Sequence, residues 1–174
     1  MAYSFKPFED NISLYQGNVK DNDILKYICA LLEQPGSDSI VRGEYTNQQN
    51  LTIQNGKMKK VPFNEDVFNL LTKLTAYYKP NNKILDVWCV SMKEGDFHMF
   101  HNHKIGGTTI AGAYYLKMPD MKPPQGNMNW ISNNNVYSYS PKDGDFFVWP
   151  SYLQHGVYPF TGSGERIMIS WNEK

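Results

Sequence analysis

The second half of the chain, from Lys83 onward, consists of short apolar segments separated by clusters of turn-forming residues. Segments of this length, bounded by Gly, Pro, Asn and Asp, predict β-strands joined by tight turns. The predicted strands are Ile84–Met92, Thr108–Met118, Asn127–Ser132, Val136–Ser140, Asp145–Trp149, Val157–Phe160 and Arg166–Asn172. This pattern indicates a β-sandwich or a jelly-roll barrel.

The first half of the chain differs, because its apolar residues recur at helical spacing. Asp23–Gln34 is predicted to form one helix, and a second is predicted from about residue 65 to residue 78, with Asn64 as its N-cap. Between them, Val41–Lys60 is polar and contains the turn signal Asn55-Gly56, which predicts a short β-ribbon. We expect the two helices to pack outside one sheet.

The length of 174 residues suits one domain with a substantial core. We therefore expect a single domain over residues 1–174. Residues 1–82 would form a helical and ribbon support, and residues 83–174 the β-barrel core that carries any functional site.

The amino-acid composition limits which partners the chain could bind and in which cellular compartment it is expected. The 17 basic and 17 acidic residues cancel, so no broad field directs the chain to nucleic acid or to an anionic membrane. No signal peptide and no apolar stretch long enough to span a bilayer is visible. Cys29 and Cys89 are the only cysteines, and we expect both to be buried free thiols in a reducing cytoplasm. Nothing indicates the oligomeric state.

Histidines are the first sign of chemistry. Three of the four, His98, His101 and His103, lie within six positions, and the fourth, His155, lies between two predicted strands. Residues two apart on an extended strand share a face, so His101 and His103 can both point into a barrel, where His155 would complete a metal site. Imidazole suits iron, copper, nickel and zinc. The alternatives are unconnected histidines near turns, or a structural zinc, although no cysteine lies near the cluster.

Arg166 is the second feature, because it is one of only two arginines. The last predicted strand places Arg166, Met168 and Ser170 on one face. A guanidinium can hold a carboxylate through two parallel hydrogen bonds. If that face points inward, Arg166 and Ser170 could hold a dicarboxylic cosubstrate beside the metal. If it points outward, Arg166 would instead pair with Glu165.

Five segments occur in a characteristic order: the two histidines of His101-Asn-His103, then Ala111–Leu116, Gly144–Ser151, His155–Pro159 and Glu165–Asn172. This series resembles the 2-oxoglutarate/Fe(II)-dependent dioxygenase superfamily, and within it a group of small proteins related to the prolyl hydroxylase type. The resemblance extends over about residues 84–172. It implies a mainly β protein with N-terminal helices, built on a double-stranded β-helix, which is a jelly-roll or cupin-like barrel.

The resemblance also implies roles for single residues. His101 and His155 match the family's two histidine ligands of iron, and Arg166 matches the arginine that binds the far carboxylate of 2-oxoglutarate. Tyr115, or its neighbour Tyr114, matches a tyrosine that often touches the same carboxylate.

One ligand departs from the family pattern. His103 stands where the family usually has an Asp or a Glu, so the predicted metal ligands are His101, His103 and His155. Asp96 could instead supply an acid, and His98 could replace one of the pair. Phe147, Trp149 and Trp171 are candidates for the apolar lining, and the segment 117–126 is either a flexible cover or a simple connecting loop.

The implied cofactors are Fe(II) and 2-oxoglutarate, and the implied activity is an oxygenase that consumes molecular oxygen, expected to be a hydroxylase of a protein side chain or of a small molecule. Two alternatives remain at the level of sequence. One is a three-histidine, cupin-like metalloenzyme that does not use 2-oxoglutarate. The other is an inactive jelly-roll binding module with Trp130, Tyr137 and Tyr139 as its ligand surface.

Overall fold

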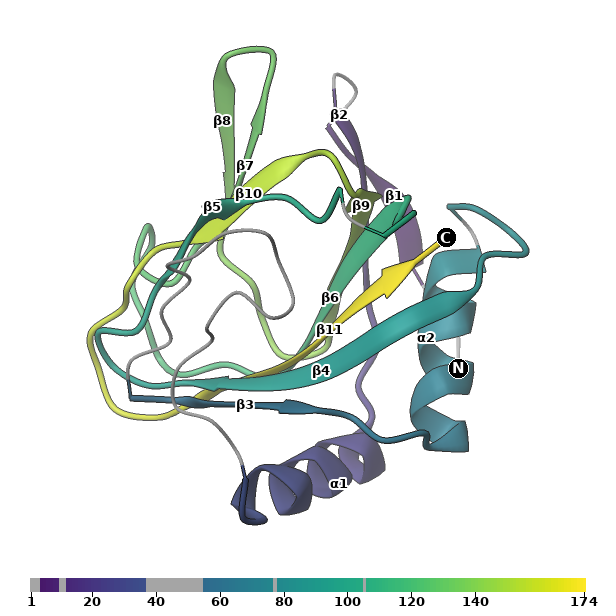
Figure 1. Ribbon diagram of the computed structural model, residues 1–174. Coiled ribbons are helices and arrows are strands. Elements are labelled where there is room, and N and C mark those ends of the chain that lie inside the picture. The colour runs from purple at the N-terminus through teal and green to yellow at the C-terminus, as the bar shows by residue number, and fades with distance from the viewer. Residues whose placement is uncertain (1–3, 10–11, 37–54, 77, 105) are drawn as a thin grey trace.

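The computed structural model of the chain describes residues 4–9, 12–36, 55–76, 78–104 and 106–174. Two helices and eleven strands lie in these ranges (Figure 1). The helices are α1 (Asn22–Glu33) and α2 (Glu65–Ala76). The strands are β1 (Ser4–Glu9), β2 (Ile12–Asn18), β3 (Lys57–Lys60), β4 (Ile84–Met92), β5 (His98–His101), β6 (Ile110–Lys117), β7 (Met128–Ser132), β8 (Asn135–Tyr139), β9 (Asp145–Pro150), β10 (Gln154–Val157) and β11 (Arg166–Glu173).

The strands form two antiparallel sheets that pack face to face. The larger has the order β1-β2-β9-β6-β11-β4-β3, and the smaller has the order β5-β10-β7-β8. Side chains from both sheets meet in one inner core, to which the large sheet contributes Tyr115, Phe147 and Trp149 and the small sheet contributes Met128 and Trp130. This is the mainly β, double-stranded β-helix architecture that we expected.

Alternation along β11 separates the inner core from a second, outer core. Met168 belongs to the inner core, whereas Ile167, Ile169 and Trp171 belong to the outer core between the large sheet and the helices. Successive side chains of a strand point to opposite faces, so one strand serves both cores. The predicted faces of this strand are confirmed.

The helices cover the outer face of the large sheet (Figure 1). The Asp21 carboxylate accepts hydrogen bonds from the backbone N–H groups of Asp23 and Ile24, which caps α1. In α2 the Asn64 side chain accepts from the N–H of Val67, as predicted for its N-cap. The second helix ends at Ala76, two residues earlier than expected, and a turn in which Tyr78 N–H donates to Thr75 O follows it.

Two parts of the strand prediction were wrong. The strand expected at Val157–Phe160 lies earlier, as β10 (Gln154–Val157), because its position is set by pairing with β5 and β7. A Cβ atom on Gly156 would lie 3.0 Å from the backbone oxygen of His98, so this close pairing favours glycine. Strands β1, β2 and β5 were not among the predicted strands, since β2 pairs with the distant β9 and β5 with the distant β10.

The predicted β-ribbon over Val41–Lys60 lies mostly outside the described residues. Its last part is β3, which pairs with β4. Cys29 and Cys89 are both free, as expected, although only Cys89 is fully buried. Across the described ranges, no helix is long and apolar enough to cross a membrane.

Candidate metal centre

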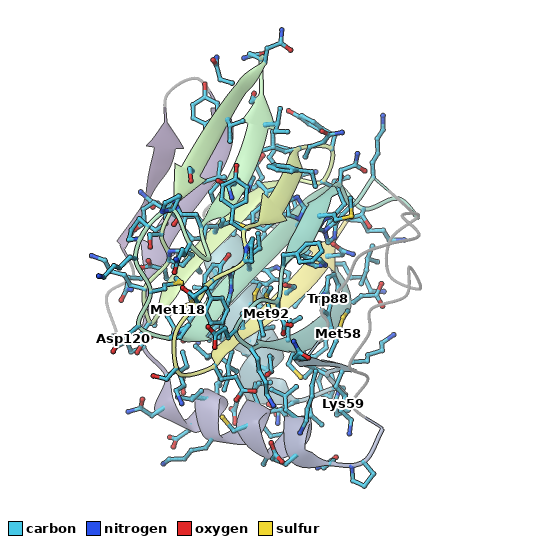
Figure 2. All side chains as sticks on the ribbon, turned by 90° about the vertical axis from the view of Figure 1, so that its left-hand side faces the viewer. Met58, Lys59, Trp88, Met92, Met118 and Asp120 are labelled. Atoms are coloured by element: carbon cyan, nitrogen blue, oxygen red, sulfur yellow. The ribbon has the colours of Figure 1, made fainter. Side chains whose placement is uncertain are left out.

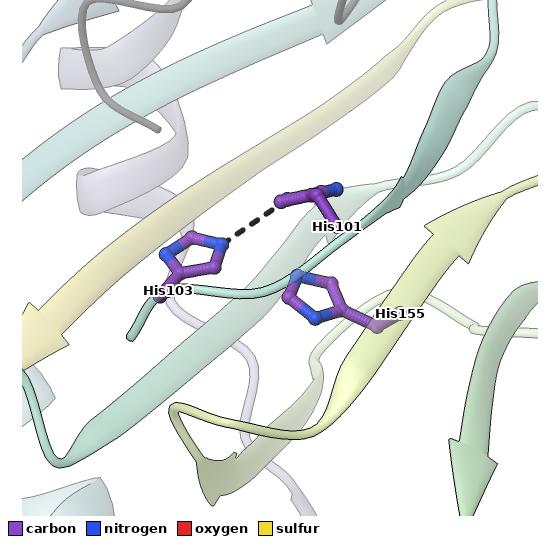
Figure 3. A group of neighbouring side chains, drawn as sticks. All are labelled: His101, His103 and His155. Carbon is purple, nitrogen blue, oxygen red and sulfur yellow. Dashed lines mark hydrogen bonds between the residues drawn. The ribbon is translucent and has the colours of Figure 1, made fainter. Parts of the chain in front are cut away.

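Three histidines, from the neighbouring strands β5 and β10 and from the segment that follows β5, converge inside the barrel (Figure 3). His101 is the last residue of β5, and His155 pairs with it directly across the ladder in β10. His103 lies two residues past the end of β5, where its N–H donates to Ser151 O at 2.8 Å. The centroid of the His101 ring is 4.3 Å from that of His155 and 5.1 Å from that of His103. All three side chains are buried.

The other nitrogen of each ring fixes its tautomer. Nδ1 of His101 lies 2.7 Å from Met99 O, and Nδ1 of His155 lies 3.0 Å from Leu153 O. Nδ1 of His103 lies 2.7 Å from the side-chain oxygen of Asn172. A carbonyl oxygen can only accept, so each Nδ1 carries the hydrogen and donates it. In a neutral ring, Nε2 is then left with a lone pair.

The lone pairs of the three Nε2 atoms suit a cation. Nε2 of His101 and Nε2 of His103 are 3.1 Å apart, the contact dashed in Figure 3, yet neither carries a hydrogen in these tautomers. Two ligands at right angles, each about 2.1 Å from one ion, would lie about 3.0 Å apart. The ligand atoms of all three residues lie within 4.8 Å of one another. The donor set therefore fits one metal ion.

Burial keeps these rings neutral. Desolvation lowers the pKa of His101 to about 4 and that of His103 to about 3. Desolvation and the neighbouring rings hold the pKa of His155 well below its usual range. At neutral pH all three imidazoles are therefore in the form that binds metal.

Two residues that the sequence analysis did not identify orient His103. The ring of Trp88 on β4 stacks on it, with centroids 5.7 Å apart and planes 10° apart. Asn172 on β11 accepts its Nδ1 hydrogen. Parity was an available signal for Asn172, because residues 166, 168, 170 and 172 share one face of a strand.

The structure does not bring Asp96 into the group. Its carboxylate accepts hydrogen bonds from the backbone N–H groups of Lys93 and Asn55, so it supports a turn. His98 lies closer, with its ring centroid 4.6 Å from that of His101, and lines the same cavity. It is not one of the three converging ligands.

Arg166 points inward and is fully buried. Its Nη1 donates to Gly126 O at 2.8 Å, and its Cζ lies 4.8 Å from the centroid of the Tyr115 ring. The hydroxyl of Tyr115 lies close enough to interact with the Arg166 charge, and beyond this contact Nε and Nη2 of Arg166 and the Tyr115 hydroxyl have no hydrogen-bond partner among the described residues. No described carboxylate forms an ion pair with Arg166 either, and Glu165 contacts Ser91 instead. A buried cation without a counter-charge is costly, so this position suits an anionic ligand.

The two tyrosines of β6 face opposite ways. Tyr115 lies in the inner core beside Arg166, whereas the hydroxyl of Tyr114 donates to Val19 O in the outer core. Tyr115 is therefore the tyrosine placed to share a ligand with Arg166. Burial raises the pKa of Tyr115, so its hydroxyl is protonated at neutral pH and can donate.

A small cavity of about 30 Å³ opens beside the histidines, and Ser170 and Trp149 line it. Phe147 lies nearby in the inner core, but the expectation that Trp171 lines the site was wrong. By strand parity Trp171 faces the helices, where its indole N–H donates to Glu173 and Thr75. Among the described residues, the lining consists of Met58, Trp88, His98, His101, His103, Gly112, Ala113, Met128, Trp149, His155, Val157, Met168 and Ser170.

The structure also shows the positions of the segment 117–126 and of the proposed aromatic ligand surface. The segment 117–126 joins β6 to β7, and its Met118 and Met121 pack against the inner core. Trp130 is fully buried, so it does not form an open ligand surface with Tyr137 and Tyr139.

The fold and the site together define a class: a double-stranded β-helix protein with a buried facial cluster of metal-binding side chains. The sequence comparison then gives the family. Residues 86–172, half of the chain, match the family described as "Putative 2OG-Fe(II) oxygenase". The chain belongs to this family of 2-oxoglutarate- and iron-dependent oxygenases, so its cofactors are Fe(II) and 2-oxoglutarate.

Solved structures agree on the fold. A 2OG-Fe(II) oxygenase family oxidoreductase from Burkholderia pseudomallei has a TM-score of 0.70 at 13% identity, over 93% of this chain and 85% of that one. A Pseudomonas putida prolyl-4-hydroxylase has a TM-score of 0.66 at 15% identity, over 94% of each chain. A Trichoplax adhaerens prolyl hydroxylase, in complex with a hypoxia inducible factor peptide fragment, has a TM-score of 0.68 at 16% identity, over 94% of this chain and 84% of that one. No curated protein matches the sequence.

Proposed function

We propose that His101, His103 and His155 hold the ferrous ion, that Arg166, Tyr115 and Ser170 hold 2-oxoglutarate, and that the enzyme hydroxylates a protein side chain or a small molecule. The observation that carries this proposal is the pairing of two complementary sites in one barrel. Three unprotonated Nε2 atoms converge at one of them, and at the other lies a buried guanidinium that forms no ion pair with any described carboxylate.

Different residues of the chain would orient the metal ligands and bind 2-oxoglutarate. The carbonyl oxygens of Met99 and Leu153 and the amide oxygen of Asn172 hold the three rings with Nε2 toward the centre. Arg166 and the Tyr115 hydroxyl offer three donors to the far carboxylate of 2-oxoglutarate. Ser170, four residues after Arg166 on the same face of β11, lines the cavity beside the histidines.

When bound, iron and 2-oxoglutarate supply the oxygen chemistry, in which one atom of O2 enters succinate and the other enters the substrate. The protein supplies orientation and exclusion of water. Trp88, Trp149 and Val157 give the cavity apolar walls, and none of the described residues that line it carries a charge at neutral pH. This lining suits an uncharged group at the reacting position. A protein side chain is one such group, and the similarity to two prolyl hydroxylases supports it.

The test uses thermal unfolding with Mn(II), with and without 2-oxoglutarate, in the wild type and in Arg166→Ala, Tyr115→Phe and His101→Ala. In the wild type, Mn(II) should raise the melting temperature, and 2-oxoglutarate should raise it further. His101→Ala should lose both increments. Arg166→Ala should keep the first and lose the second, because removing the partner of a buried charge costs about 2–5 kcal/mol of binding.

Tyr115→Phe tests the same site if the Arg166→Ala variant does not fold, because it removes only one hydroxyl group. It should weaken 2-oxoglutarate binding alone. The matched control is Lys117→Ala, which removes an exposed cation from the neighbouring strand and should change neither increment. A wild type that binds Mn(II) without any effect of 2-oxoglutarate would favour the three-histidine, cupin-like alternative. A wild type with neither increment would favour the inactive binding module.

A further inference from the structure

An irregularity in strand β5 turns a fourth histidine toward the cavity. His98 and His101 are three positions apart, so on a regular strand their side chains would point to opposite faces. Their partners in β10, Val157 and His155, are only two positions apart, so β5 carries one extra residue over this stretch. Such a bulge changes the direction of the side chains beside it. The ring of His98 accordingly lies 4.6 Å from that of His101, measured between centroids, and lines the same cavity.

One nitrogen of His98 is buried without a partner. Nε2 of His98 makes no hydrogen bond with any described residue. The large sheet gives this cavity an apolar wall, to which Met58 and Trp88 of the paired strands β3 and β4 belong (Figure 2). An unpaired buried polar atom destabilises a fold, and such atoms are rare in native structures. A ligand that enters the cavity would supply the missing partner.

His98 is also close to both parts of the proposed site. Burial lowers the pKa of His98 well below its usual range. Positive charge on the nearby His101, His103 and Arg166 lowers that pKa further. The ring is therefore neutral at neutral pH, with one hydrogen on either of its two nitrogens. Because it is near the metal-binding histidines and also near the guanidinium, it lies beside the span that 2-oxoglutarate would occupy.

The chemistry of 2-oxoglutarate calls for one more donor. Its two carboxylates are ionised at neutral pH and its keto group carries no hydrogen, so every oxygen can only accept. In the proposed function, Arg166 and Tyr115 bind the far carboxylate. A 2-oxo acid that binds an ion through its keto oxygen and one carboxylate oxygen leaves the second oxygen of that carboxylate free. In a buried site an anionic oxygen needs a hydrogen-bond donor.

We propose that the Nε2–H group of His98 donates a hydrogen bond to this second oxygen and so orients the 2-oxo acid end of the cosubstrate. The inference rests on the proposed function. It makes His98 a contact of the cosubstrate and not of the ion, in keeping with its place outside the three converging ligands.

Trp149 provides the comparison. It lines the same cavity, and its indole nitrogen also lacks a partner among the described residues. Its ring, however, meets the ring of His155 edge-on, with centroids 4.8 Å apart. We therefore expect Trp149→Phe to weaken 2-oxoglutarate binding less than a substitution of His98 does.

The first test separates metal binding from 2-oxoglutarate binding. Mn(II) is titrated into the wild type, His98→Leu and His98→Gln, and 2-oxoglutarate is then titrated into each Mn(II)-loaded protein. His98→Leu should bind 2-oxoglutarate about 10–100-fold more weakly, the usual effect of losing a hydrogen bond to a charged group, and should bind Mn(II) as the wild type does. His98→Gln keeps an N–H donor and should recover most of the affinity.

The stability of the metal-free protein gives a second readout. His98→Leu removes the unpaired buried nitrogen, so its melting temperature without metal should be higher than that of the wild type. A histidine with a merely structural role would give the opposite result, a lower melting temperature. The combination of a more stable protein with weaker cosubstrate binding is therefore specific to the proposed role.

The third readout is the tautomer of His98. Nuclear magnetic resonance of protein with isotopically labelled histidine, loaded with diamagnetic Zn(II), distinguishes Nε2–H from Nδ1–H. With 2-oxoglutarate bound, His98 should carry its hydrogen on Nε2, and its signals are identified by their absence from His98→Gln. A hydrogen on Nδ1 in that complex would contradict the proposal.

Other results would also overturn the inference. If His98→Leu binds 2-oxoglutarate as tightly as the wild type, while the wild type binds Mn(II) and 2-oxoglutarate, His98 is not a contact and the proposed function stands. If Trp149→Phe has the larger effect, the indole is the donor instead. If the wild type with Mn(II) does not bind 2-oxoglutarate at all, the proposed function fails, and the inference fails with it.

Discussion

At the scale of single residues, the proposed centre differs from the family pattern by the charge of one ligand. His103 replaces the usual carboxylate, and its supporting partner, Asn172, is also neutral. Three neutral imidazoles leave the full charge of a divalent ion in place, and the buried Arg166 adds another positive charge to the same barrel. A doubly negative cosubstrate such as 2-oxoglutarate would balance most of this charge.

We expect Asn172→Leu to weaken Mn(II) binding by about 10–100-fold, the usual effect of removing a supporting partner of a metal ligand. The physical reason is that His103 would no longer be held with Nε2 toward the centre. Asn172→Asp keeps an acceptor at the same place and should retain the affinity. The measurement is titration of Mn(II) followed by electron paramagnetic resonance. Equal affinity in the leucine variant and the wild type would contradict a positioning role.

At the scale of elements, strand β11 joins the proposed site to the helices. Its inner face carries Arg166, Ser170 and Asn172, and its outer face carries Trp171. A Cβ atom on Gly112 of the neighbouring β6 would lie 2.2 Å from the Trp171 ring, so the glycine leaves room for the indole. Glu173 ends the strand, and its buried carboxylate accepts from Thr75 on α2 at 2.7 Å and from Trp171 at 3.0 Å.

We expect Glu173→Gln to stabilise the protein increasingly as pH rises. Burial raises the pKa of this carboxyl, so the wild type loses stability as pH rises from the unfolded value through the folded one, whereas glutamine does not titrate. Melting temperatures across that pH range give the comparison. Glu173→Ala is the control, and it should cost about 1–3 kcal/mol because Trp171 and Thr75 would each lose their shorter hydrogen bond and keep only the longer ones, to Thr75 at 3.3 Å and to Leu71 O at 3.1 Å. A glutamine variant whose difference from the wild type is independent of pH would refute the expectation.

The elements also show what the sequence could predict and what it could not. Strand β4 was predicted at its observed bounds, because an apolar run between turn residues specifies a buried strand locally. Strand β10 was misplaced, because its position depends on long-range pairing with β5 and β7. In the same way, spacing suggested His101, His103 and His155. Parity could place Asn172 on the inner face of β11, but its contact with His103, and that of Trp88 on β4, depend on the large sheet lying against the segment after β5, which is a long-range contact.

At the scale of the whole molecule, the barrel buries its histidines in neutral form. The pKa of His101 is lowered to about 4 and that of His103 to about 3. In an unfolded chain both would have the usual value of 6.5. Between these values the unfolded state binds more protons than the folded one, so stability falls as pH falls.

We expect the metal-free protein to lose stability from about pH 6.5 downward, through the folded values near 4 and 3. His103→Leu removes one of the titrating groups, so its stability should fall less steeply over the same range. Denaturant unfolding in the presence of a chelator, at several pH values, measures both slopes. Parallel slopes for the two proteins would show that His103 does not titrate as its burial implies.

The direct pairing of His155 with His101 has one more consequence. These residues face each other across β10 and β5, and β5 is a four-residue strand at the margin of the smaller sheet. An ion bound by both histidines would cross-link the two strands. Loss of that ion would weaken the pairing of β5 with β10 as well as remove the metal, so the same ion would support both the activity and the local structure of the smaller sheet.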